Sequence, residues 1–228
     1  STSSRVVGEA LAYAGEHLAG VCRYDGSPML DHAVNVAKIV ISEIGLGRNS
    51  TVSAILHDVV RLAHKQLPAE EFLRLTEEIR ARFGEQVVGI TMGLANISEL
   101  KLKVAKEQAD NFFRDLIVSY SEDPRVILIK LADRLHNACT FQFLPERKQR
   151  DKALETMEIY APIAHRLGMS RIKWELEDLS LKVLDPIGYN EIVEGLKAQS
   201  EQHEEFLQGI QDRISTKLKE ANIHNAIS

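Results

Sequence analysis

Apolar residues recur at helical spacing along almost the whole chain, and alternating strand-like runs are nearly absent. The pattern therefore predicts an all-α fold. The expected helices cover residues 5–20, 23–45, 51–64, 69–83, 85–97, 102–123, 124–141, 146–169, 171–184 and 189–223. Glycines interrupt the segment 85–97, which we expect to be a short helix that leads into a loop. The last segment is rich in charge and is expected to form one or two solvated helices.

Glycine, proline and small polar residues predict several of the helix ends. The second helix is expected to stop at Gly45, and Pro124 is expected at a first helical position, where an N–H has no partner anyway. Pro162 predicts a kink in the helix that contains it. Either Ser50 or Thr51 is expected to cap the third helix, because a short polar side chain can accept a hydrogen bond from its free N–H groups.

Length and charge narrow the functional classes. With 228 residues the chain can bury a substantial core, and its 27% of charged residues is ordinary for a soluble, helix-rich protein. The net charge of −5 predicts no broad basic surface, so we expect no DNA partner. An anionic ligand would have to be held by a local patch or by a metal.

Cysteine usage and hydropathy indicate the compartment. Cys22 and Cys139 are too few for a disulfide framework, and we expect both to be reduced, half-buried thiols. No apolar run reaches the ~18 residues of a membrane span, and no signal-peptide pattern opens the chain. We therefore expect a cytoplasmic protein with no membrane partner.

Four residues on three different predicted helices are candidates for a metal site: His32, the adjacent pair His57 and Asp58, and Asp133. Two imidazoles and two carboxylates form a mixed ligand set that suits Mn, Fe or Zn. Neighbouring side chains on a helix diverge by ~100°, so a metal at the helix edge can contact both members of the pair. Taken alone, however, His57 is better explained as a satisfied histidine, by about three to one.

Asp133 strengthens the case for a site because it interrupts an apolar helix. A carboxylate buried there needs a partner, and a metal is one solution. An ion pair with Lys130 or Arg134 is the structural alternative. Asn137 and Thr140 follow at helical spacing on the same face, which predicts the polar wall of a cleft. The remaining histidines of interest lie among polar or helix-end neighbours and are interpreted as non-ligands: His17, His64, His136 and His165.

Several stretches of the sequence resemble one known family. These are "RYDGSPMLDHAVNVAKI", "ILHDVV", "QADNFFRDLI", "RVILIKLADRLHNACT" and "EIYAPIAHRLGMSRIKWELEDLSLKVLDP". Together they resemble the HD hydrolase half of long RelA/SpoT homologues, which make and degrade the alarmone (p)ppGpp. The resemblance implies an HD-domain helical fold over residues 1–165. It also implies connecting helices over residues 166–228 that lead toward a (p)ppGpp synthetase domain of the same full-length protein, absent from this chain.

The resemblance also implies a site. In the family, a bound Mn²⁺ ion supports removal of pyrophosphate from the 3′ position of ppGpp or pppGpp. The metal ligands carried over fall on His32, His57, Asp58 and Asp133, and the substrate contacts fall on Arg23, Asn137 and Thr140. The expected ligand is therefore a guanine nucleotide, and the expected reaction is metal-assisted hydrolysis.

The chain departs from the family where water would be activated. Family hydrolases read H-D-x-x-E-D, and here Arg61 and Leu62 occupy the two acid positions. Arginine stays protonated at neutral pH and leucine cannot transfer a proton, so we expect impaired hydrolysis. Tyr24 also replaces a residue that is usually basic. Glu70 or Glu71, in a stretch longer than usual, is the alternative base.

Three functions remain open from the sequence. The first is a (p)ppGpp 3′-pyrophosphohydrolase-type domain with impaired turnover. The second is a non-catalytic module that senses a nucleotide or metal and regulates the synthetase domain. The third is an HD phosphohydrolase for another nucleotide, because Arg61 and Tyr24 alter the surface that would select the substrate.

Overall fold

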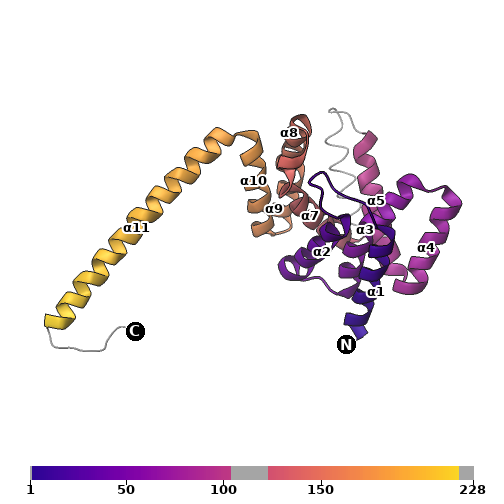
Figure 1. The fold of residues 1–228 in the computed structure, drawn as a ribbon, viewed down its shortest axis with the longest axis horizontal. Helices are drawn as coiled ribbons and strands as arrows, with labels where there is room; N and C mark the ends of the chain where they lie inside the picture. Colours follow the sequence, from indigo (N-terminus) through magenta and orange to yellow (C-terminus); the bar gives the residue numbers. More distant parts are fainter. Residues whose placement is uncertain (1, 104–122, 221–228) are drawn as a thin grey trace. The chain divides into compact units, whose positions relative to one another are not determined.

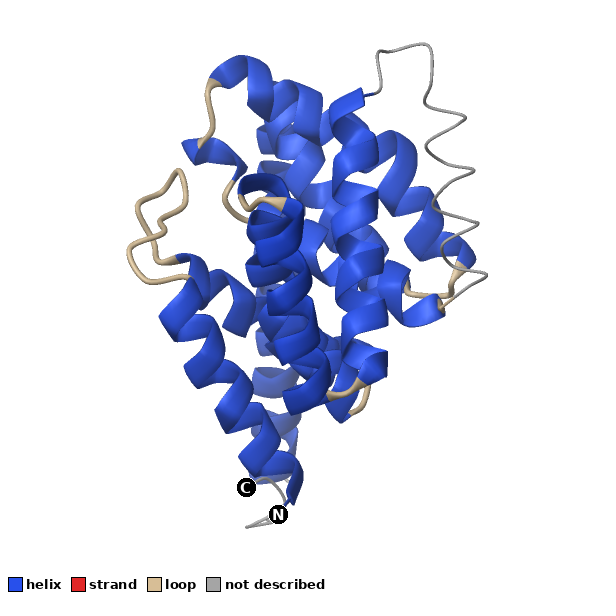
Figure 2. Cartoon of the chain, turned by 90° about the vertical axis from the view of Figure 1, so that its right-hand side faces the viewer, coloured by secondary structure: helices blue, strands red, loops and turns tan. Residues whose placement is uncertain are grey.

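The computed structural model describes residues 2–103 and 123–220, and there every regular element is a helix (Figure 1; Figure 2). The helices are α1 (Thr2–His17), α2 (Met29–Ile39), α3 (Arg48–Gln66), α4 (Ala69–Phe83), α5 (Glu85–Lys103), α7 (Pro124–Ala138), α8 (Glu146–Glu155), α9 (Ala161–Arg166), α10 (Ser170–Leu184) and α11 (Pro186–Glu220). Shorter turns are two π segments, Val40–Ile44 and Thr156–Tyr160, and one 3₁₀ segment, Phe141–Phe143. The predicted all-α class is confirmed.

The chain forms two compact units, residues 1–183 and residues 184–228. The second unit contains α11, which is one continuous helix through the described residues. The division predicted after residue 165 stays a prediction. The helix predicted over residues 102–123 lies almost entirely outside the described residues. Within the described ranges, no helix is both long enough and apolar enough to span a bilayer.

Helix α3 is the centre of the first unit. It packs against α1, α2, α4 and α5, and every residue from Ser50 to Val60 is buried. A helix that is buried on all sides has no solvent-facing stripe for its polar residues. The polar side chains of α3 must therefore be satisfied by groups inside the protein.

Most predicted helix ends agree with the structure. Gly45 ends the second helix with φ 77°. Pro124 is the first residue of α7, and the side chain of Asp123 before it accepts a hydrogen bond from the Arg125 N–H. The predicted cap of the third helix is wrong, because α3 starts one turn earlier and is capped at Gly47. Thr51 lies inside that helix, where its hydroxyl donates to the Gly47 carbonyl at 3.1 Å.

Two further expectations need correction. Cys22 and Cys139 are free, as predicted, but both are exposed rather than half-buried. The helix predicted over residues 146–169 is divided by the π turn Thr156–Tyr160, just before Pro162. Proline has no N–H and its ring displaces the carbonyl four residues earlier, so the disturbance falls in the preceding turn.

Glycine has a packing role in α5 that the sequence pattern does not show. The predicted short helix over residues 85–97 is wrong, because α5 continues to Lys103. At Gly93 a methyl group would lie 2.9 Å from a Val126 methyl carbon on α7. The missing side chain therefore lets α5 and α7 approach closely, and the cost of glycine in a helix is offset by this contact.

Arg134 fixes the rotation of α7. Its buried guanidinium donates to the Thr156 hydroxyl at 2.8 Å and lies 2.7 Å from a Glu155 carboxylate oxygen. It also lies over the Tyr160 ring, 4.4 Å from the centroid. Because these partners belong to α8 and the following π turn, Arg134 holds α7 in one orientation.

The contact at Gly93 can be tested with two alanine variants in the same helix. We expect Gly93→Ala to lower the free energy of unfolding by about 1 kcal/mol, because overpacking against Val126 outweighs the gain in helix propensity. Gly89→Ala, where a methyl group meets open space, should instead stabilise by up to about 1 kcal/mol. Urea denaturation measures both values, and effects of the same sign would contradict the close approach.

Candidate metal centre

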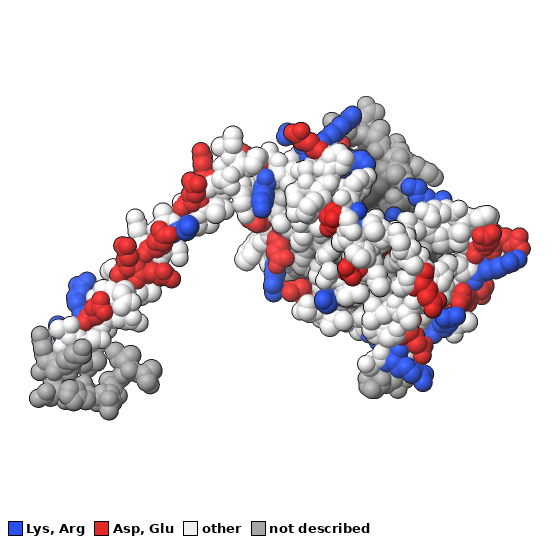
Figure 3. Space-filling model, in the orientation of Figure 1, with Lys and Arg blue, Asp and Glu red and all other residues white. Residues whose placement is uncertain are grey.

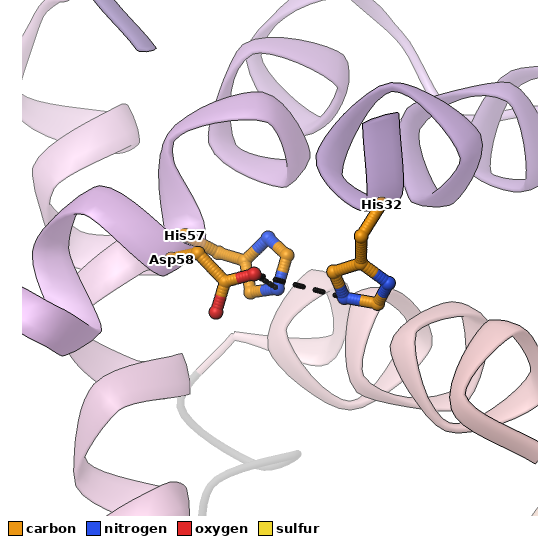
Figure 4. A group of neighbouring side chains, drawn as sticks. All are labelled: His32, His57 and Asp58. Atoms are coloured by element: carbon orange, nitrogen blue, oxygen red, sulfur yellow. Dashed lines mark ion pairs between the residues drawn. The ribbon is translucent and has the colours of Figure 1, made fainter. Parts of the chain in front are cut away.

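The structure brings the four predicted metal ligands together from α2, α3 and α7. Potential ligand atoms of His32, His57 and Asp58 all lie within 4.8 Å of one another (Figure 4). Oδ2 of Asp58 is 3.4 Å from Nε2 of His57 and 3.7 Å from Nε2 of His32. Oδ1 of Asp133 is 3.1 Å from Nε2 of His32 and 3.9 Å from Nε2 of His57. All four residues are buried.

The proton on His57 can be placed from its neighbours. Its Nδ1 lies 2.6 Å from the carbonyl oxygen of Ala54, which can only accept a hydrogen bond. Nδ1 therefore carries the proton in the neutral ring, and Nε2 presents a lone pair. This is the tautomer that binds a metal, with a backbone carbonyl fixing the orientation of the ring.

Two adjacent atoms of the cluster have no hydrogen-bond partner among the described residues. They are Nε2 of His57 and Oδ2 of Asp58. Both are buried and both offer an electron pair, so leaving them facing each other without a cation is costly. A divalent transition metal satisfies both atoms, and the surrounding donor set of imidazole and carboxylate fits such an ion. The residues present therefore fit a metal centre.

Of the partners that the sequence left open for Asp133, the structure shows Lys130. Its Oδ2 accepts from Lys130 Nζ at 2.6 Å, while Oδ1 accepts from Asn137 at 2.7 Å and faces His32. Arg134, the other predicted ion-pair partner, binds Glu155 of α8 instead. The carboxylate is therefore held by Lys130 and still directs one oxygen toward the histidines.

Both carboxylates are ionised at neutral pH. Burial alone would raise the pKa of the Asp133 carboxyl, but the Lys130 ammonium and the hydrogen bond from His32 hold that pKa well below its ordinary value. Burial likewise opposes ionisation of Asp58, and the nearby histidines and Arg61 outweigh it, so its pKa is also lowered. Metal ligands must be deprotonated, and both acids meet that requirement.

Arg61 binds one of the candidate ligands directly. Its Nε donates to Oδ1 of Asp58 at 2.7 Å, and its Nη2 lies 2.6 Å from the same oxygen. The Arg61 side chain is 34% exposed, whereas that of Asp58 is 3% exposed. Leu62 follows, partly buried and without a polar side-chain atom. The two positions at which the resemblance expects acids therefore hold a cation and an apolar side chain.

The three residues predicted to contact substrate also meet, beside His32. The Arg23 guanidinium donates to the Thr140 hydroxyl at 2.7 Å and to the Asn137 side-chain oxygen at 3.1 Å. Its other terminal nitrogen contacts Nδ1 of His32. A phosphate could replace the neutral acceptors of Arg23 with charged oxygens, which bind a guanidinium more strongly.

His136 is the member of the site that sequence reasoning missed. Its Nδ1 lies 2.7 Å from Nδ1 of His32 and 3.2 Å from Arg23. Burial, with the charges of His32 and Arg23, lowers the pKa of His136 to about 4, so the ring is neutral at pH 7. Its position three residues after Asp133 places it on the same face of α7, and that spacing was the available signal.

The remaining departures from the family have structural partners. The Tyr24 hydroxyl accepts a hydrogen bond at 2.8 Å from Lys148 of α8, which supplies a cation next to this position. Glu70 and Glu71 are exposed in the first turn of α4, and Glu70 pairs with Arg74 at 2.8 Å. Charged side chains of both signs gather over α4 (Figure 3). The candidate replacement base Glu70 is therefore engaged in a surface ion pair.

Comparison with known proteins places the chain in a family. Residues 10–170 match the HD domain. A guanosine-3′,5′-bis(diphosphate) 3′-pyrophosphohydrolase of Aquifex aeolicus is 40% identical over 87% of this chain and 27% of that protein. The bifunctional (p)ppGpp synthase/hydrolase SpoT of Escherichia coli K12 is 38% identical over 96% of this chain and 30% of that protein. A GTP pyrophosphokinase of Streptomyces coelicolor is 36% identical over 100% of this chain and 26% of that protein.

The chain thus spans less than a third of the length of these relatives. A solved structure of a metazoan ortholog of SpoT, said to hydrolyze ppGpp, superposes with a TM-score of 0.50 and 20% identity. It covers 82% of this chain and 95% of its own, and at that identity it supports the fold alone. The predicted relationship to RelA/SpoT homologues is confirmed. Because the HD match covers more than half of the sequence, the chain belongs to the HD-domain family.

Proposed function

We propose that this chain binds a divalent metal, Mn²⁺ in the first instance, together with ppGpp or pppGpp, and that its 3′-pyrophosphohydrolase activity is impaired. The observation that carries the proposal is a buried pair of atoms, Nε2 of His57 and Oδ2 of Asp58, that have no hydrogen-bond partner among the described residues. The substrate class comes from the names of the relatives in Aquifex aeolicus and Escherichia coli.

His57 and Asp58 would hold the metal, with His32 and Asp133 beside them. A bound divalent ion polarises a phosphoryl oxygen and lowers the pKa of a coordinated water toward ~7. The carbonyl of Ala54 keeps the His57 ring in the ligating tautomer. Burial of the cluster keeps bulk water from competing with these contacts.

Arg23, Asn137 and Thr140 would hold the nucleotide. Their three side chains already form one connected group next to His32. The guanidinium supplies a planar fork of donors that matches phosphate oxygens, while the amide and hydroxyl can turn toward ribose or phosphate. The acidic net charge of the chain does not oppose this, because the binding group is local.

Turnover needs a proton acceptor within reach of the attacking water. Arg61 lies where the family places an acid, remains protonated, and is bound to Asp58. Leu62 offers no proton acceptor. Binding with little hydrolysis is therefore the expected behaviour.

The contact between Arg61 and Asp58 also favours a second candidate function. A domain that binds its ligand but rarely converts it can report on that ligand by favouring one conformation. The relative in Escherichia coli carries both synthase and hydrolase functions in a protein that this chain covers by 30%. The second candidate function is therefore that this chain regulates a synthetase domain in the same full-length protein.

The metal centre is tested by the thermal stability of the purified chain with and without Mn²⁺. A ligand that binds only the folded state at about 100 times its Kd stabilises by about 2.7 kcal/mol, so the wild-type melting temperature should rise. His57→Ala removes one of the two buried atoms that would bind the metal, and it should abolish most of that rise. An equal rise in both proteins would place the bound metal elsewhere.

The cause of impaired turnover is tested by Arg61→Glu combined with Leu62→Asp. We expect this double variant to hydrolyse ppGpp roughly 100-fold faster than wild type or more, because a positioned acid–base group contributes about that much. Release of pyrophosphate and GDP in the presence of Mn²⁺ is the measurement, with calorimetric ppGpp binding beside it.

A control variant carries the same charge change on the surface. Leu73→Asp combined with Arg74→Glu alters two exposed positions of α4 and should leave turnover at the wild-type rate. If the Arg61–Leu62 variant still binds Mn²⁺ but hydrolyses ppGpp no faster than wild type, the missing acids do not explain the impaired turnover. Fast hydrolysis by the wild-type chain would show instead that another residue accepts the proton of the attacking water.

A further inference from the structure

Each carboxylate of the metal centre already has its own cation. Arg61 binds Asp58 through Oδ1, and Lys130 binds Asp133 through Oδ2, each with a contact of 2.6 Å. Figure 4 shows one Asp58 oxygen close to the two histidines and the other directed away from them. The two oxygens of Asp58 therefore have different roles, because one faces the centre and the other is taken by Arg61.

The charges of this group balance without a metal. Apart from the imidazoles, two carboxylates meet one guanidinium and one ammonium, so these four charges cancel. Arg23, which touches His32, adds a further positive charge at the edge of the group. A divalent ion would thus enter a centre that is already neutralised, whereas a carboxylate-rich centre would attract it.

We infer that Arg61 is a resident counter-ion of Asp58, which stabilises the metal-free domain and weakens the affinity of the centre for divalent cations. The inference rests on the proposed function, in which this centre holds a metal. Arg61 cannot lose its charge at neutral pH, so its repulsion of an incoming cation persists. Its contact withdraws negative charge from the carboxylate whose Oδ2 would be a ligand.

The geometry lets Arg61 lower the affinity of the centre for a metal without blocking the metal from binding. Both of its contacting nitrogens bind the same oxygen, Oδ1, and Oδ2 stays without a hydrogen-bond partner among the described residues. The guanidinium approaches from the partly exposed side of α3, while the histidines approach from inside. Arginine and metal would therefore share one carboxylate through different oxygens.

Removal of the Arg61 charge has two effects of opposite sign. The metal-free protein loses stability, because Asp58 is then buried without its cation. The affinity for Mn²⁺ increases, because the repulsion is gone and the carboxylate is fully available. A residue with a purely structural role would lower stability and leave the metal affinity unchanged or weaker.

The experiment measures Mn²⁺ binding by electron paramagnetic resonance of the free ion, and melting in EDTA, on the whole purified chain. Arg61→Gln should lower the Kd for Mn²⁺ roughly tenfold, which is about 1.4 kcal/mol, and should lower the melting temperature in EDTA. Arg61→Lys keeps the charge and should stay within about threefold of the wild-type Kd. Arg74→Gln, at an exposed pair with Glu70, should match wild type in both measurements.

The outcomes separate this inference from the proposed function. If neither wild type nor Arg61→Gln binds Mn²⁺, the metal centre itself is wrong. If both bind with the same Kd, the centre stands and the counter-ion role is overturned. Should Arg61→Gln fail to fold, Arg61→Met carries the same expectation, because its unbranched apolar chain replaces the packing of the arginine stem.

Discussion

The burial of two consecutive polar residues on α3 is the constraint on which the centre depends. His57 and Asp58 lie in a helix segment that is buried on all sides, so neither can direct its polar atoms to solvent. The neighbouring helices must supply the partners, and α2 contributes His32 while α7 contributes Asp133. The same requirement limits how α2 and α7 can be rotated against α3. The contacts that fix the packing of the first unit therefore also fix the geometry of the site.

Much of this architecture follows from the sequence. Helical periodicity predicts the helices because the apolar stripes are long, and the four candidate metal ligands stand out because they interrupt those stripes. Two features could not be found in this way. Gly93 has the local signature of a helix breaker, and only its tertiary contact with Val126 gives it a role inside α5. His136 does not interrupt an apolar stripe. Its spacing of three residues from Asp133 is its one signal in the sequence, and its contact with His32 becomes visible only when the helices are packed.

The role of Arg61 could be predicted only in part from the sequence. Its identity marks a departure from the family, but the sequence does not say whether the guanidinium faces solvent or Asp58. Helical spacing of three residues permits the contact, and the partial burial of the arginine with the full burial of Asp58 makes it favourable. The residue that stands where the resemblance expects an acid is thus also the one that compensates the buried Asp58 carboxylate.

The pocket that holds Arg134 has a consequence for which changes in chain length the domain tolerates. Asp133 precedes Arg134 directly, so the rotation of α7 that seats the guanidinium against Thr156 also aims the carboxylate at the histidines. Thr156 opens a π turn, which contains one residue more than an α-helical turn. Deleting one residue there would remove the extra residue of that turn and shift Glu155 and Thr156 relative to Tyr160, the three residues that hold the guanidinium. A change in length between α8 and α9 would therefore alter the orientation of Asp133 in the candidate metal centre.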